Sequence, residues 1–283
     1  MLKGSCLCGE SAWEVTGPLE SAIHCHCGIC RKHHGSTFSS YAAAPERAFG
    51  WLRRRGSARR HESSPGFFRH FCGRCGSKLP GDPNGGRVFV ALGNLDGDPD
   101  VRPMAHIFAA SKAPWHEWTD SLPRFDTWPP GVDAPVRPSP LRSGPPDGRA
   151  GGSCLCGAVV YAIEGPLSFL RNCHCSRCRK ARGAAFATNA PFEIARLQWL
   201  RGEESVRSYK VPEARFFTQA FCGECGSPVP RLDASRGLAI VPAGSLDHAP
   251  GARVHEHIFA DSKAPWFEIR DTLSRHAEAA PAR

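Results

Sequence analysis

The sequence has no long uninterrupted run of apolar residues. No stretch approaches the roughly 18 apolar residues that a membrane-spanning helix needs. The opening residues, "MLKGSCLCGE", are not followed by an apolar run of signal-peptide length. We therefore expect a cytoplasmic protein that makes no use of a membrane.

Long helical patterns are scarce as well. The 29 glycines and 25 prolines among 283 residues favour short strands, turns and loops, while 41% hydrophobic residues exclude a disordered chain. Alternating residues predict strands, some of them running into turns, at 11–17, 67–76, 87–97, 158–165, 215–226 and 237–248. A short helix is expected over residues 29–34, ended by Gly35. The predicted class is mainly β.

Charge and cysteine content narrow the possible partners. The net charge of +9 favours an anionic partner, either nucleic acid or a small acidic ligand. The chain has 14 cysteines. Thiols in the cytoplasm stay reduced, so this number predicts metal binding and not disulfide bonds.

Four motifs occur twice. "GSCLCG", "CHCxxCRK", "FCGxCGS" and "HIFAxSKAPW" recur at offsets of 148 to 151 residues, and each copy carries seven of the cysteines. The sequence therefore predicts two homologous domains, 1–128 and 149–275. A proline-rich stretch, 129–148, is expected to be an extended linker. Residues 276–283 are expected to form a tail.

Each copy pairs a Cys-x-Cys near its start with a Cys-x-x-Cys after its middle. Two such elements can form a closed, tetrahedral zinc site that contributes directly to folding. The expected structural ligands are Cys6, Cys8, Cys72 and Cys75 in the first copy, and Cys154, Cys156, Cys222 and Cys225 in the second.

Three further cysteines remain in each copy: Cys25, Cys27 and Cys30, then Cys173, Cys175 and Cys178. Three protein ligands with an open position are typical of a catalytic zinc. Zinc with three thiolates carries a net charge of −1, which suits holding a substrate thiol as thiolate better than hydrolysis. A closed Cys₃His site is the alternative, with a ligand from His24, His26, His33 or His34 in the first copy and His174 in the second.

These motifs resemble the glutathione-dependent formaldehyde-activating enzyme family, which includes centromere protein V, and the resemblance covers both copies. It implies an Mss4-like, β-rich fold and a zinc-dependent carbon–sulfur lyase that adds glutathione to formaldehyde. It also implies a structural role for the four-cysteine sets and a catalytic role for the three-cysteine sets. We expect four Zn²⁺ per chain, two in each domain. The duplication leaves open whether both copies are active.

Several basic residues are candidates for contact with the thiol substrate: Arg31, Lys32, Lys112, Arg179, Lys180 and Lys263. For Arg31 with Lys32, and for Arg179 with Lys180, the alternative is that they are solvated charges on a helix. Trp115 and Trp266 are expected to be packing residues. His106 and His257 are expected to be hydrogen-bonded core residues and not zinc ligands.

Two readings compete with the lyase. One is a non-enzymatic zinc module that binds nucleic acid or protein through a basic surface. The basic stretch 51–62 could serve it, although the second copy has Glu203 and Glu204 at that place. The other is a scaffold with all four metal sites closed.

Overall fold

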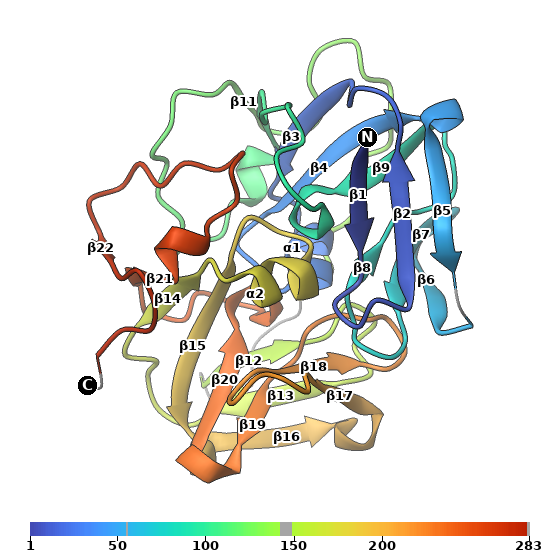
Figure 1. Ribbon diagram of the computed structural model, residues 1–283. Coiled ribbons are helices and arrows are strands. Elements are labelled where there is room, and N and C mark those ends of the chain that lie inside the picture. Colours follow the sequence, from blue (N-terminus) through green and yellow to red (C-terminus); the bar gives the residue numbers. More distant parts are fainter. Residues whose placement is uncertain (55, 142–148, 282–283) are drawn as a thin grey trace.

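The computed structural model describes residues 1–54, 56–141 and 149–281. Part of the predicted linker (142–148), the last two residues of the predicted tail (282–283) and Arg55 of the basic stretch lie outside the described residues. The chain forms two similar β-rich copies, coloured blue to green and yellow to red in Figure 1. Among the described residues, no helix combines the length and the apolar character that crossing a membrane would take.

The first copy contains three sheets, with strand orders β1-β2-β5, β11-β10-β3-β4-β9 and β6-β7-β8. Their strands are β1 (Leu2–Ser5), β2 (Ser11–Val15), β3 (Ser21–Cys25), β4 (Ser39–Pro45), β5 (Phe49–Arg54), β6 (Ala58–Ser64), β7 (Phe67–Cys72), β8 (Lys78–Leu79), β9 (Arg87–Ala91), β10 (His106–Ile107) and β11 (Arg124–Phe125).

The second copy repeats this plan, with strand orders β12-β13-β16, β19-β20-β15-β14-β21-β22 and β17-β18. Its strands are β12 (Ala150–Ser153), β13 (Val160–Ile163), β14 (Leu170–Cys173), β15 (Ala187–Glu193), β16 (Leu197–Arg201), β17 (Val206–Lys210), β18 (Thr218–Cys222), β19 (Arg231–Asp233), β20 (Leu238–Pro242), β21 (Val254–Ile258) and β22 (Ser274–Arg275). The mainly β class is confirmed.

The two α-helices of the described residues are short and equivalent. The predicted helix is α1 (Gly28–His34), which ends at Gly35 in the left-handed region with φ 59°. Its counterpart α2 (Ser176–Arg182) ends in the same way at Gly183, with φ 61°. Single 3₁₀ turns complete the structure: η1 (Glu46–Ala48), η2 (Leu92–Asn94), η3 (Ala109–Ser111), η4 (Ile194–Arg196), η5 (Glu203–Ser205), η6 (Ala234–Arg236), η7 (Ala243–Ser245) and η8 (Ala260–Ser262).

Both helices lie at the interface between the copies (Figure 1). Helix α1 packs on η7 of the second copy, and α2 packs on η2 of the first. A side chain at Gly244 would collide with the carbonyl oxygen of Arg31, and one at Gly93 would collide with the backbone of Ala184. Glycine is therefore required at both points, where the backbones of the two copies meet. The interface has approximate two-fold symmetry.

The two "KAPW" segments are exchanged between the copies. Trp115, which follows β10 of the first copy, lies in the apolar core of the second with Tyr161. Trp266, which follows β21 of the second copy, lies in the core of the first with Trp13. Both exchanged tryptophans are buried, as predicted for packing residues. Each copy thus completes the core of the other.

Candidate metal centres and the cavity of the second copy

The four-cysteine clusters assemble as their spacing predicts. Cys6 and Cys8 lie in the turn between β1 and β2, while Cys72 and Cys75 frame the turn between β7 and β8. The Sγ atoms of Cys6 and Cys8 are 3.5 Å apart, and those of Cys8 and Cys72 are 3.7 Å apart. All four sulfurs lie within 4.8 Å of one another, and so do those of Cys154, Cys156, Cys222 and Cys225.

These separations fit zinc. Four ligands at about 2.3 Å in a tetrahedron lie about 3.8 Å from one another. The cysteines of these clusters are hard to ionise without a metal ion. Hydrogen bonding to Cys156, together with burial, raises the pKa of Cys154 well above its usual value. Thiols packed so closely do not ionise together without a positive charge to balance them. Both four-cysteine clusters could therefore hold a metal ion.

The three-cysteine clusters have one construction in both copies. Cys25 ends β3, Cys27 is the N-cap residue of α1, and its sulfur accepts a hydrogen bond from the backbone N–H of Cys30 at 3.3 Å. In the second copy Cys175 caps α2, and its sulfur accepts a hydrogen bond from the backbone N–H of Cys178 at 3.4 Å. The Sγ atoms of Cys173 and Cys175 are 3.6 Å apart. Each set of three lies within 4.8 Å. The strand end and the helix start thus fix three sulfurs around one point.

No histidine nitrogen belongs to either three-sulfur group among the described residues. His24 Nδ1 lies 2.9 Å from Ser40 Oγ, and His34 lies within hydrogen-bond distance of the Arg182 carbonyl and the Tyr41 hydroxyl. His174 Nε2 lies 2.8 Å from His257 Nδ1, and neither ring nitrogen of His174 belongs to the sulfur cluster of its copy. The geometry does not support the closed Cys₃His alternative.

A chain of hydrogen bonds runs behind each three-cysteine cluster. His106 Nε2 lies 3.1 Å from both carboxylate oxygens of Asp120, so it is the donor there. Its Nδ1 then accepts from His26 Nε2 at 2.8 Å. His174, His257 and Asp271 repeat this arrangement. His106 and His257 are thus hydrogen-bonded and buried, and the chains fix the loops that carry the cysteines.

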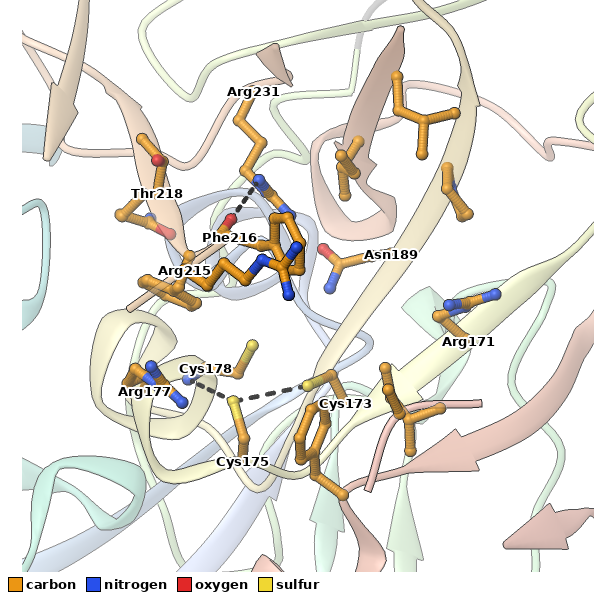
Figure 2. Close-up of a pocket in the computed structure, with 18 of the residues that line it drawn as sticks. Arg171, Cys173, Cys175, Arg177, Cys178, Asn189, Arg215, Phe216, Thr218 and Arg231 are labelled. Carbon is orange, nitrogen blue, oxygen red and sulfur yellow. Dashed lines mark hydrogen bonds between the residues drawn. The ribbon is translucent and has the colours of Figure 1, made fainter. Parts of the chain in front are cut away.

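The second cluster opens onto a cavity of about 330 Å³ (Figure 2). Phe216, Phe217 and Ile258 contribute apolar wall. Among the described residues, no carboxylate side chain lines this cavity, but six arginines do: Arg171, Arg177, Arg182, Arg215, Arg231 and Arg236. Three of these arginines face carboxylates that are not part of the cavity wall: Arg171 lies 3.1 Å from Glu256, and Asp233 lies 3.9 Å from Arg231 and 2.6 Å from Arg236. With the other three arginines, the wall still carries an excess of positive charge and suits an anionic ligand.

The arginines of the cavity come from separate elements, which is why sequence motifs missed most of them. Arg177 and Arg182 belong to α2, Arg171 to β14 and Arg231 to β19. In Figure 2, Arg215 and Arg231 lie on the opposite side of the cavity from the sulfurs. The one signal in the sequence was the density of arginine in and around "SRCRKAR".

The structure places the predicted substrate lysines elsewhere. Lys32 is fully buried at the interface, where its Nζ lies 2.8 Å from Asp247 and donates to the carbonyl oxygen of Ser153 at 2.8 Å. Lys180 makes the reciprocal contacts, at 2.7 Å to Asp96 and 2.6 Å to Ser5 Oγ. Neither residue lines the cavity, and both link the two copies.

The other basic candidates are also separate from the cavity. Arg31 is buried with its guanidinium 5.8 Å from the Trp115 ring centre, and Arg179 Nε donates to the carbonyl oxygen of His174. Lys112 Nζ donates to the carbonyl oxygen of His116, and Lys263 is exposed. None of the six predicted basic residues lines the cavity.

The basic stretch 51–62 lies on β5 and β6, whose arginines stack on neighbouring rings. Arg54 lies 5.0 Å from the Trp51 ring centre, and Arg60 lies 4.5 Å from that of Phe68. Arg59 reaches the carbonyl oxygen of Gly223 in the second copy. The second copy keeps the equivalent tryptophan, Trp199, but has Glu203 and Glu204 where the first has its run of arginines, so the basic surface is particular to the first copy.

Fold and site together define a duplicated, mainly β protein with four cysteine clusters that can hold metal. The family profile described as "Glutathione-dependent formaldehyde-activating enzyme" matches residues 1–111 and 149–262. The chain belongs to this family and contains two copies of its domain. Both matches stop just before the exchanged tryptophans.

No curated protein matches the chain. A solved structure of a Rhodobacter sphaeroides protein from a structural genomics programme is similar to part of it. The two are 29% identical, with 32% of this chain and 83% of that chain covered, at a TM-score of 0.28.

Proposed function

We propose that this protein is a zinc-dependent carbon–sulfur lyase that acts on the adduct of formaldehyde with a glutathione-type thiol. One observation carries the proposal. The sulfurs of Cys173, Cys175 and Cys178 form a cluster that lines an arginine-rich cavity, and no fourth metal-binding donor joins them among the described residues. Family membership supports the same reaction.

Cys173, Cys175 and Cys178 would hold the metal of this site. When bound, zinc would lower the pKa of a coordinated thiol and keep it as thiolate. The protein's own residues bind and orient the substrate. Arginines of the cavity wall pair with carboxylates of the thiol compound, and the hydrogen-bonded His174 holds the cysteine loop in place.

The reaction balances without an oxidant. The thiolate sulfur attacks the carbonyl carbon of formaldehyde and forms the new carbon–sulfur bond. The π electrons of the carbonyl move to its oxygen, which takes up the proton that the thiol released. The product, S-hydroxymethylglutathione, contains every atom of both reactants, and the reverse step is the lyase direction.

The test is the rate of exchange between glutathione and its formaldehyde adduct, measured by NMR exchange spectroscopy. Because the reaction also proceeds in free solution, the informative quantity is the rate above that background. We expect the zinc-loaded protein to accelerate exchange and Cys175→Ser to abolish the acceleration. An exchange rate equal to the background at every protein concentration would contradict the proposal.

A nucleic-acid module remains the competing reading. Nucleic-acid binding weakens steeply with added salt because counterions are released from the phosphates, whereas thiol capture does not. Titration of a labelled single strand at two salt concentrations, beside titration of glutathione, separates the two.

A further inference from the structure

The two three-cysteine clusters match in their sulfurs but differ in what faces them. The second site has Asn189 on β15 and Gln219 on β18, and both line its cavity. The equivalent residues of the first copy are the larger Tyr41 on β4 and Arg69 on β7. The change from tyrosine to asparagine and from arginine to glutamine removes side-chain volume and leaves space beside the second cluster.

In the first copy that space is filled, and its charge is balanced internally. The Tyr41 hydroxyl lies 2.7 Å from His34 Nε2, and Tyr41 and Arg69 interact electrostatically. Arg69 interacts electrostatically with Cys25, Cys27 and Cys30, the three sulfurs of its own copy. A guanidinium beside this cluster balances part of its negative charge from within the protein, and its side chain occupies space that Gln219 leaves open in the second copy.

The segment after β11 adds a cover to the first site. Trp128 packs against the group formed by Cys25, Cys30 and Phe108, with 4.9 Å between the ring centres of Trp128 and Phe108. A side chain at Gly28, the first residue of α1, would meet Ser139 Oγ at 2.6 Å and Pro140 at 3.0 Å. The chain therefore lies against the start of the helix that carries Cys30.

The cations of the second site are particular to that copy. Arg171, Arg177 and Arg182 line the cavity, and the first copy has Ile23, Ile29 and His34 at the same places, 148 residues earlier. Several of the six arginines stay partly solvent-exposed, so a ligand can reach them.

We propose that the second three-cysteine cluster alone takes up the external thiol, and that Arg177 and Arg215 select thiols that carry carboxylates, while the first cluster is a structural site that no substrate reaches. This inference rests on the proposed function for the identity of the reactant as a thiol. It adds which copy reacts and which residues determine specificity.

The experiment is calorimetric titration of the zinc-loaded, full-length protein with glutathione and with glutathione diethyl ester, which keeps the thiol but lacks free carboxylates. We expect one glutathione per chain. Arg177→Gln and Arg215→Gln should each weaken glutathione binding about tenfold, the size of one charge-assisted hydrogen bond, and leave ester binding unchanged. Arg53→Gln, an exposed arginine on β5, is the matched control.

Two sets of variants assign the copy. Cys27→Ser should keep the stoichiometry at one, whereas Cys175→Ser should remove thiol binding. Since Cys175→Ser also disturbs a metal ligand, the double variant Asn189→Tyr, Gln219→Arg fills the cavity with the first copy's own residues. It should retain all its zinc, measured by atomic absorption, and lose thiol binding.

The failures are distinguishable. Absence of thiol binding to the wild type contradicts the proposed function itself. Two thiols per chain, or loss of binding in Cys27→Ser, leaves that function standing and overturns the assignment to the second copy. Equal weakening of glutathione and its ester by the arginine variants overturns the role of the carboxylates.

Discussion

Lys32 of the first copy and Asp247 of the second form a buried ion pair, with 2.8 Å between Nζ and the carboxylate oxygen. The equivalent pair, Lys180 with Asp96, spans 2.7 Å but lies nearer to solvent. The same contact thus occurs twice across the interface, once buried and once partly exposed.

This difference predicts unequal effects of the same substitution. Lys32→Met removes the cation that faces Asp247 and the donor to the Ser153 and Ser245 carbonyl oxygens, so we expect a loss of about 3 kcal/mol of stability. Lys180→Met should cost less than about 1 kcal/mol, as is usual for exposed pairs. Urea denaturation of both variants measures the difference, and equal losses would contradict the structure of this interface.

Because the "KAPW" segments are exchanged, a substitution in the segment of one copy should destabilise the core of the other. Trp266→Ala should cost about 3 to 5 kcal/mol. Because Trp266 packs with Trp13 and Val90, faster hydrogen exchange is expected in β2 and β9 of the first copy. Leu200→Ala, at an exposed site on β16, is the control and should change exchange in neither copy. Faster exchange confined to the second copy would argue against the exchanged arrangement.

The cysteine clusters predict two classes of metal ligand. Cys72→Ser should release one zinc and unfold the protein, because a structural zinc contributes about 10 kcal/mol or more, comparable to the whole stability of a domain. Cys175→Ser should release one zinc and leave the β-structure intact. Metal analysis of the wild type, for which we expect four zinc ions per chain, and far-ultraviolet circular dichroism of both variants provide the measurements. Unfolding of the Cys175 variant would make that cluster structural too.

The first copy has a half-buried histidine, with its Nε2 atom shielded from solvent, that the second copy replaces with phenylalanine: His116 corresponds to Phe267. Burial lowers the pKa of His116 to about 3, whereas the unfolded chain takes up this proton near pH 6.5. The folded state therefore binds fewer protons between pH 6.5 and 3, and stability is lost as the pH falls through that range.

His116→Phe removes this loss. Between pH 7 and 5 the wild type should lose about 2 kcal/mol more stability than the variant. Acid also weakens zinc binding, but it does so in both proteins, so the comparison isolates the histidine. Parallel pH profiles would show that His116 becomes protonated in the folded protein.

The duplication and the cysteine clusters were predictable because each depends on short motifs. The strand that carries Cys72 and the helix stop at Gly35 follow from local residue types, whereas β3, which ends at Cys25, was not predicted. Which copy each "KAPW" segment completes was not predictable. Repeated motifs are equally compatible with packing inside a copy and with exchange, and only the three-dimensional path of Trp115 separates the two.

The arginine-lined cavity could not be predicted from the sequence either. Its cations span residues 171 to 236 and meet only because strands β14 and β19 and helix α2 converge on one side of the second copy. Lys32 and Lys180 show a second limit of the motifs. Their place beside a cysteine motif suggested substrate contact, whereas helical geometry directs them to the partner copy.

Trp115 and Trp266 each fill part of the core of the other copy. A core substitution accumulated in one copy would therefore also destabilise the other. The surroundings of the sulfur triads bear no such mutual constraint. One cluster can therefore become specialised for a substrate while the other keeps only a structural role. Among natural relatives that carry this duplication, we expect sequence variation around the three-cysteine clusters and little variation at the two exchanged tryptophans.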